Sequence, residues 1–188
     1  MANVNHSTLS DPYLHEPKGV ATASSGDIYL ANGSGSGAWR QAHSHIDAYL
    51  AFDATTPAYA HSATTSFTVI NPTLATTTAN GFTATNTPNA RLTYTGTQNL
   101  SSNIHITIST NQSTGTNKDV EWQIYKNGSL LTGSHVIRTI SSGTWGNVAL
   151  LGNSTLATND YLEIYSKISS AGTVNYASIF WTVKGLPA

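Results

Sequence analysis

Apolar and polar residues alternate along most of the chain, a pattern typical of β-strands with one buried face. From 45 to 53, every second residue is apolar and would share one face of a strand, namely Ile46, Ala48, Leu50 and Phe52. The same pattern predicts strands at 66–70, 91–95, 103–109, 120–126, 135–140, 144–151, 161–168 and 174–184, with turns at 87–89, 126–128 and 158–160. Because no helical periodicity is present, this spacing predicts an all-β, antiparallel β-sandwich of the jelly-roll type.

The last two expected strands differ in the character of their faces. In 161–168, Leu162, Ile164 and Ile168 form an apolar face, and the opposite face, which includes Glu163, is polar. In 174–184 both faces are apolar: one carries Val174, Tyr176 and Phe180, and the other carries Ala177, Ile179, Trp181 and Val183. The last strand therefore has no face suited to water.

A strand that is apolar on both sides is covered either by another layer of its own chain or by another subunit. We predict a subunit interface at this strand, formed by Tyr176, Ala177, Ile179, Trp181 and Val183. The alternative is that the N-terminal segment folds back over this sheet.

The N-terminal segment, up to about residue 40, has neither helical nor strand periodicity and is interrupted by prolines and glycines. We expect an extended arm. Within it, 27–30 and 37–39 flank a glycine-rich run and predict a small β-hairpin, which is marginal in water and should dock on another surface. The predicted organisation is an anchoring arm at 1–44 and a jelly-roll trimerisation domain at 45–188.

Composition narrows the possible partners. Charged residues make up 9% of the chain, against about 25% in typical soluble proteins, but 39% hydrophobic residues indicate a folded chain. The eight Lys and Arg are scattered and the net charge is -1, so we expect no nucleic acid partner. No apolar run approaches the roughly 20 residues of a membrane helix, and we expect no membrane partner and no export signal.

The best candidate for chemistry is the set His43, His45 and Asp47, because i, i+2, i+4 spacing on a strand places all three on one face. Two imidazoles and a carboxylate can bind a transition metal. The simpler interpretation, which we adopt, is a polar strand face without metal or cofactor. No nucleophile elbow, phosphate loop or paired carboxylates are recognisable, so we expect no enzymatic activity.

Several segments in order resemble a known family: 89–96 (NARLTYTG), 122–128 (WQIYKNG), 156–164 (LATNDYLEI) and the closing aromatic strand. Together, over about 65–188, they resemble the tumour-necrosis-factor/C1q-like (TNF-like) jelly rolls of phage structural proteins. The resemblance implies a tight turn at 156–161 and a final strand in the inner sheet near a trimer axis. The segments 11–19 and 26–29 are similar to segments of tailed-phage virion proteins.

The resemblance implies assembly rather than catalysis. We expect a homotrimeric decoration or cement protein on the outer capsid surface, bound to the major capsid protein or another virion protein. The expected anchoring residues of the arm are Pro12, Tyr13, His15, Pro17 and Trp39. The main alternative is a receptor-binding head fibre, tail fibre or tail tip that recognises a host glycan or protein. A secreted or cell-surface carbohydrate-binding module is a more distant alternative.

Overall fold

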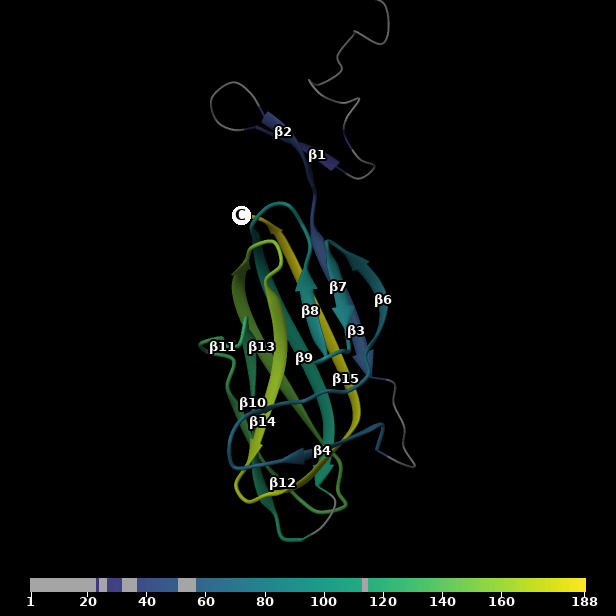
Figure 1. The fold of residues 1–188 in the computed structure, drawn as a ribbon, viewed down its shortest axis with the longest axis vertical. Coiled ribbons are helices and arrows are strands. Elements are labelled where there is room, and N and C mark those ends of the chain that lie inside the picture. The colour runs from purple at the N-terminus through teal and green to yellow at the C-terminus, as the bar shows by residue number, and fades with distance from the viewer. Residues whose placement is uncertain (1–22, 24–26, 32–36, 51–56, 113–114) are drawn as a thin grey trace, which may run out of the picture. The chain divides into compact units, whose positions relative to one another are not determined.

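The computed structural model describes residues 23, 27–31, 37–50, 57–112 and 115–188. By its internal contacts the chain divides into two compact units, Met1–Ala42 and His43–Ala188. All regular structure among the described residues is β, and every strand pairing is antiparallel (Figure 1).

The first unit contains the predicted hairpin. Strands β1 (Asp27–Ala31) and β2 (Gly37–Gln41) pair so that Tyr29 lies opposite Trp39. The two rings meet edge to face, with centroids 5.5 Å apart. Gly37 is needed at its position, because a Cβ there would lie 2.7 Å from the Tyr29 ring. The expected arm residues Pro12, Tyr13, His15 and Pro17 lie outside the described residues.

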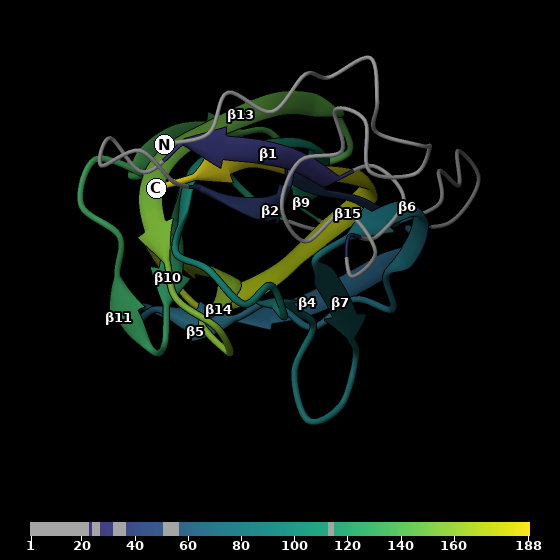
Figure 2. The same ribbon diagram turned by 90° about the horizontal axis from the view of Figure 1, so that it is seen from above.

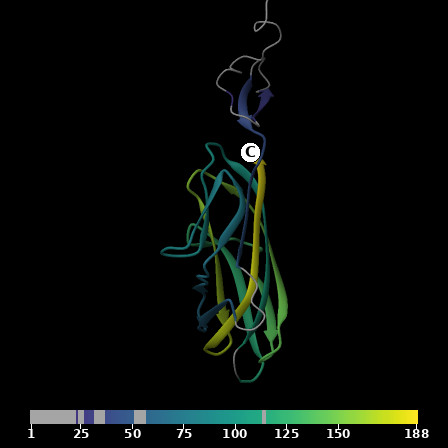
Figure 3. The same cartoon turned by 90° about the vertical axis from the view of Figure 1, so that its right-hand side faces the viewer.

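The second unit is a sandwich of two sheets around one core, seen from its end in Figure 2. The β10–β14 sheet contains β5 (Thr68–Val69), β7 (Phe82–Thr85), β8 (Arg91–Tyr94), β10 (Lys118–Lys126), β11 (Ser129–Leu130), β12 (Val136–Ile140) and β14 (Tyr161–Ile168). The β9–β15 sheet contains β3 (Ser44–Leu50), β4 (Tyr59–Ala63), β6 (Ala75–Asn80), β9 (Leu100–Gln112), β13 (Gly146–Leu156) and β15 (Gly172–Pro187). In Figure 3, β15 runs the length of the sandwich.

Alternation of side chains builds the core, as the sequence predicts. In β3, Ile46, Ala48 and Leu50 are buried while the residues between them are only partly covered. In β14, Leu162 and Ile164 point into the core, and the bounds of this strand are those predicted. The predicted turns at 126–128 and 158–160 are also present, with positive φ at Asn127, Gly128 and Asn159.

Four strands were not predicted: β4, β6, β7 and β11. Strand β6 shows why, because its sequence ATTTAN is exposed at five of six positions and has no apolar alternation. Its place in the sheet comes from pairing with β3 rather than from burial. A strand without a buried face gives no periodic signal in the sequence.

A bulge in β15 corrects the prediction for the last strand. The register with β9 shifts between Tyr176 and Ser178, which makes Ala177 an extra residue. An extra residue changes the phase of the alternation, so Tyr176 before the bulge and Ile179, Trp181 and Val183 after it all face the core. Phe180, on the opposite face, is 48% exposed.

The strand is therefore not apolar on both faces. The five side chains assigned to a subunit interface, Tyr176, Ala177, Ile179, Trp181 and Val183, are at most 1% exposed in the single chain. They form or border the core of their own sandwich, so they offer no exposed surface to another subunit in this fold.

Candidate functional site

The outward faces of the two sheets differ sharply in charge. The ion pairs among the described residues all lie on the β10–β14 sheet or in the turns at its ends: Arg91–Glu163, Lys126–Asp160, His135–Glu121 and Lys167–Glu121. In the strands of the β9–β15 sheet, the only Asp, Glu, Lys or Arg residues are Asp47 and Lys184. In a chain this poor in charge, the uneven distribution separates a charged face from a nearly neutral one.

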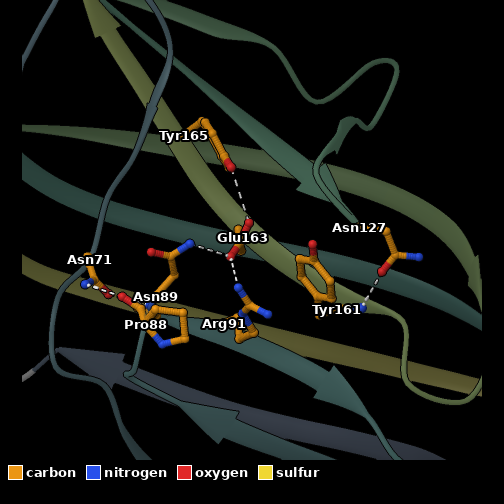
Figure 4. A network of polar contacts seen from close by, with 9 residues as sticks. Asn71, Pro88, Asn89, Arg91, Asn127, Tyr161, Glu163 and Tyr165 are labelled. Carbon is orange, nitrogen blue, oxygen red and sulfur yellow. Dashed lines mark hydrogen bonds and ion pairs between the residues drawn. The ribbon is translucent and has the colours of Figure 1, made fainter.

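The charged face is organised around a buried carboxylate, Glu163, whose side chain is 2% exposed (Figure 4). Its Oε1 accepts hydrogen bonds from Arg91 Nη2 at 2.8 Å and Asn89 Nδ2 at 3.1 Å. The Tyr165 hydroxyl lies 3.4 Å from Oε2, and burial together with the charge of Glu163 raises the pKa of Tyr165. The Arg91 guanidinium also covers the Tyr161 ring, 4.1 Å from its centroid. These contacts hold β8 and the loop before it against β14.

The outward face of the β9–β15 sheet carries an apolar patch. The strand register places Tyr49, Phe180, Thr107 and Ala149 in one row across β3, β15, β9 and β13. Leu151 lies beside this row on the same face of β13 and is 59% exposed. We call Tyr49, Phe180, Ala149 and Leu151 the apolar patch. The patch was not predicted from the sequence, because the bulge reverses which residues of β15 point outward.

At one end of the same face, His43, His45 and Asp47 line a single pocket of about 780 Å³. The prediction that these residues share a face is confirmed. The two imidazole rings stack with centroids 5.1 Å apart, and the Asp47 carboxylate accepts hydrogen bonds from Thr78 at 3.1 Å and Thr182 at 2.8 Å. Among the described residues, no three His, Cys, Asp or Glu side chains are arranged to hold a metal ion.

A buried histidine was not anticipated. His61 in β4 is 7% exposed, with Nε2 3.0 Å from Thr68 Oγ1 and Nδ1 3.3 Å from the Tyr59 hydroxyl. Burial lowers the pKa of His61, because the charged imidazolium is poorly solvated there. Its strand was not predicted, so nothing in the sequence distinguished this histidine from a surface one.

The hairpin of the first unit exposes aliphatic side chains. Ile28 is 42% exposed and Leu30 is 38% exposed, both on the face opposite Tyr29. Trp39, one of the five predicted anchoring residues, packs against the Tyr29 ring. Among the described residues of this hairpin, the large exposed apolar side chains are therefore Ile28 and Leu30.

Neither a protein-family model nor a curated protein sequence matches the chain. Solved structures do match it. Eiger TNF from S. frugiperda is 10% identical with a TM-score of 0.51, over 77% of this chain and 94% of that one. Murine APRIL at pH 8.0 is 12% identical with a TM-score of 0.49, over 77% of this chain and 99% of that one. The PRD1 vertex protein P5 is 13% identical with a TM-score of 0.44, over 77% of this chain and 97% of that one.

The similarity to Eiger concerns the fold. Together with the sheet topology, it confirms the predicted fold class, an antiparallel jelly roll of the TNF-like type. The described part of the chain holds no helix able to cross a lipid bilayer.

Proposed function

We propose that this protein is a non-enzymatic structural component of a phage particle that decorates the outer capsid surface as a homotrimer. The observation that carries the proposal is the contrast between a charged β10–β14 face and a nearly neutral β9–β15 face with an apolar patch. Protein interfaces are depleted of charge at their centre and enriched in aromatic residues. The β9–β15 face has this composition, whereas the β10–β14 face is suited to water.

The family resemblance in the sequence implies a trimer with the final strand near its axis. The structure changes which side chains can make that contact, because the inward face of β15 is already buried in its own chain. We therefore assign the subunit interface to the apolar patch, with Phe180 at 48% exposure and Leu151 at 59% as its most accessible members.

The hairpin supports anchoring on a second virion protein. A two-stranded hairpin gains little stability by itself, and here Ile28 and Leu30 remain exposed. Contact with the major capsid protein would bury them. Three copies held in one trimer would bind together, so that weak contacts add up to stable attachment. The phage setting rests on the resemblance of about 65–188 to the jelly rolls of phage structural proteins, to which the resemblance of 11–19 and 26–29 to segments of tailed-phage virion proteins adds.

Co-sedimentation of the purified full-length protein with bare capsids of its phage tests this proposal. We expect the trimer to bind, and the double variant Ile28→Asp with Leu30→Asp to bind at least about tenfold more weakly, since two apolar contacts are lost. Ile137→Asp, at an exposed apolar residue of β12, is the matched control. Binding that is unchanged in the double variant would exclude the hairpin as the anchor.

The alternative role, a receptor-binding fibre or tail tip, uses the same trimer and differs in copy number. A decoration protein is present in many copies per particle, and a tail tip in few. Quantitative mass spectrometry of purified virions distinguishes the two, and a copy number of only a few per particle would overturn the decoration role.

A further inference from the structure

Lys184 differs from every other basic side chain of the second unit. The others all donate to a carboxylate or a carbonyl: Arg91 to Glu163, Lys118 to Ser170 and Ala171, Lys126 to Asp160, Arg138 to Asn147, and Lys167 to Glu121. Lys184 is exposed and has no hydrogen bond or ion pair with any described residue. It lines the pocket that contains His43 and His45.

Two polar side chains flank this ammonium, and one of them has an unsatisfied nitrogen. The strand register places His45 of β3 and Asn103 of β9 on either side of Lys184. His45 Nδ1 is buried and has no hydrogen-bond partner among the described residues, a condition that costs free energy unless a ligand or water satisfies it. The neighbouring strands β3, β15 and β9 thus place three side chains next to one another, each able to donate a hydrogen bond.

The acidic group of the pocket is engaged elsewhere. The two carboxylate oxygens of Asp47 accept hydrogen bonds from the hydroxyls of Thr78 and Thr182. Lys184 forms no ion pair with Asp47, so its ammonium remains available to a ligand that carries acceptors. A carboxylate accepts charge-assisted hydrogen bonds from an ammonium and can also accept one from an imidazole N–H.

The size and walls of the pocket limit the ligand further. Its volume of about 780 Å³ lies within the range of small-molecule sites and far exceeds what one inorganic anion fills. Leu186 and Pro187 supply an apolar wall, and Ser101 adds a hydroxyl. A sugar ring has both an apolar C–H face and hydroxyls, and so fits such mixed walls.

We propose that this pocket binds a sugar acid, a pyranose ring that carries a carboxylate. The carboxylate accepts from Lys184 and His45, the ring hydroxyls bond to Asn103 and Ser101, and the C–H face packs on Leu186. The site goes beyond a structural role: on the proposed virion function, on which this consequence rests, it gives the particle a means of attaching to acidic polysaccharide. It requires no particular oligomeric state.

Isothermal titration calorimetry of the full-length protein tests the site, with glucuronate and N-acetylneuraminate as probes. We expect at least one of them to bind with a Kd of about 1 mM or lower, and acetate and glucose to bind at least about tenfold more weakly. If acetate binds as tightly as the sugar acids, the site recognises only the negative charge and the proposal fails. If glucose binds as tightly, the carboxylate contributes nothing and Lys184 does not have the proposed role. Absence of binding by both probes at about 10 mM would overturn the proposal.

Two variants assign the binding to the pocket. Lys184→Gln should weaken binding of the sugar acid at least about tenfold, while Lys118→Gln, on the other sheet, should leave it unchanged. In ¹⁵N-edited NMR spectra the amide of Gly185 should shift on titration and that of Gly128 should not. Equal affinities of the two variants, or shifts confined to the β10–β14 sheet, would contradict the assignment. Light scattering on the same samples reports the trimer separately, so failure of the site and failure of the proposed assembly are distinguishable.

Discussion

The indole N–H of Trp122 in β10 donates a hydrogen bond of 3.1 Å to the phenol oxygen of Tyr176 in β15. This bond crosses the core and joins the two sheets, and both side chains are 0% exposed. The Tyr176 hydroxyl lies 3.4 Å from Ser166 Oγ in β14. Burial raises the pKa of Tyr176 to about 12, so its phenol stays protonated at neutral pH.

Replacing Tyr176 with Phe should destabilise the sandwich by about 1 to 3 kcal/mol, because the Trp122 N–H is then left buried without an acceptor. Urea unfolding, followed by tryptophan fluorescence, measures the change. Tyr49→Phe, whose ring lies in the apolar patch, is the control and should change the free energy of unfolding by less than about 0.5 kcal/mol. Similar values for the two variants would mean that the bond across the core contributes little.

Glu163→Gln tests the network of Figure 4. The amide keeps the shape of the carboxylate but removes its charge, so Arg91, whose side chain is 24% exposed, loses its ionic partner. We expect a loss of about 2 to 4 kcal/mol in the free energy of unfolding, less than the about 3 to 5 kcal/mol typical of a fully buried pair, because Arg91 is partly exposed. Glu121→Gln, at a more exposed ion pair, should cost about 1 kcal/mol or less. A ranking in the opposite order would show that Glu163 is not a stabilising partner.

His61 makes stability depend on pH in the acid range. Because burial lowers its pKa in the folded state, the unfolded chain takes up a proton below about pH 6.5 that the folded chain does not. The contribution of the neutral His61 to the free energy of unfolding is therefore present above that pH and is lost as the pH falls below it. Denaturant unfolding between pH 7 and 5 should show a smaller loss for His61→Gln than for the wild type. If the free energy of unfolding falls equally with pH in the wild type and in His61→Gln, His61 does not have this role.

Phe180→Lys tests the assigned subunit interface, because an unpaired charge at the centre of an apolar contact is costly to bury. Light scattering coupled to size exclusion should show monomers for this variant and trimers for Ile137→Lys, an equally apolar exposed site on the other sheet. Circular dichroism should remain that of the wild type. If Phe180→Lys stays trimeric, the interface lies elsewhere.

In contrast, a charge at Ile179 or Trp181 should unfold the chain itself, since both belong to its core.

Local patterns explain which features could be predicted from the sequence. The bounds of β14, the hairpin and the Asn127-Gly128 turn were predicted, because each follows from alternation or from residues that favour positive φ. The bulge at Ala177 was not, because a small apolar residue gives no signal that the alternation changes phase there. Because of that single residue, the interface that we now propose lies on the opposite face of the sheet.

Contacts between distant segments were also beyond a local pattern. Glu163 was placed on a polar face, but its partner Arg91 is 72 residues away in the sequence. Lys184, His45 and Asn103 likewise come from three strands that only the sheet order makes adjacent. His43, His45 and Asp47 could be grouped because they belong to one strand and its start, where a spacing of two determines the face.

The position of β15 between β3 and β9 has a consequence for synthesis of the chain. The first and last strands of the sandwich are neighbours, and the Asp47–Thr182 hydrogen bond joins residues 135 positions apart. During translation β3 and β9 are made long before the strand that separates them, so their unpaired edges stay open until then. Pairing over such distances in sequence is slow and leaves nascent chains prone to aggregation. The sandwich therefore closes only when synthesis of β15 is complete. The amount of folded protein obtained in the cell should depend on how well the edges of β3 and β9 are protected until then.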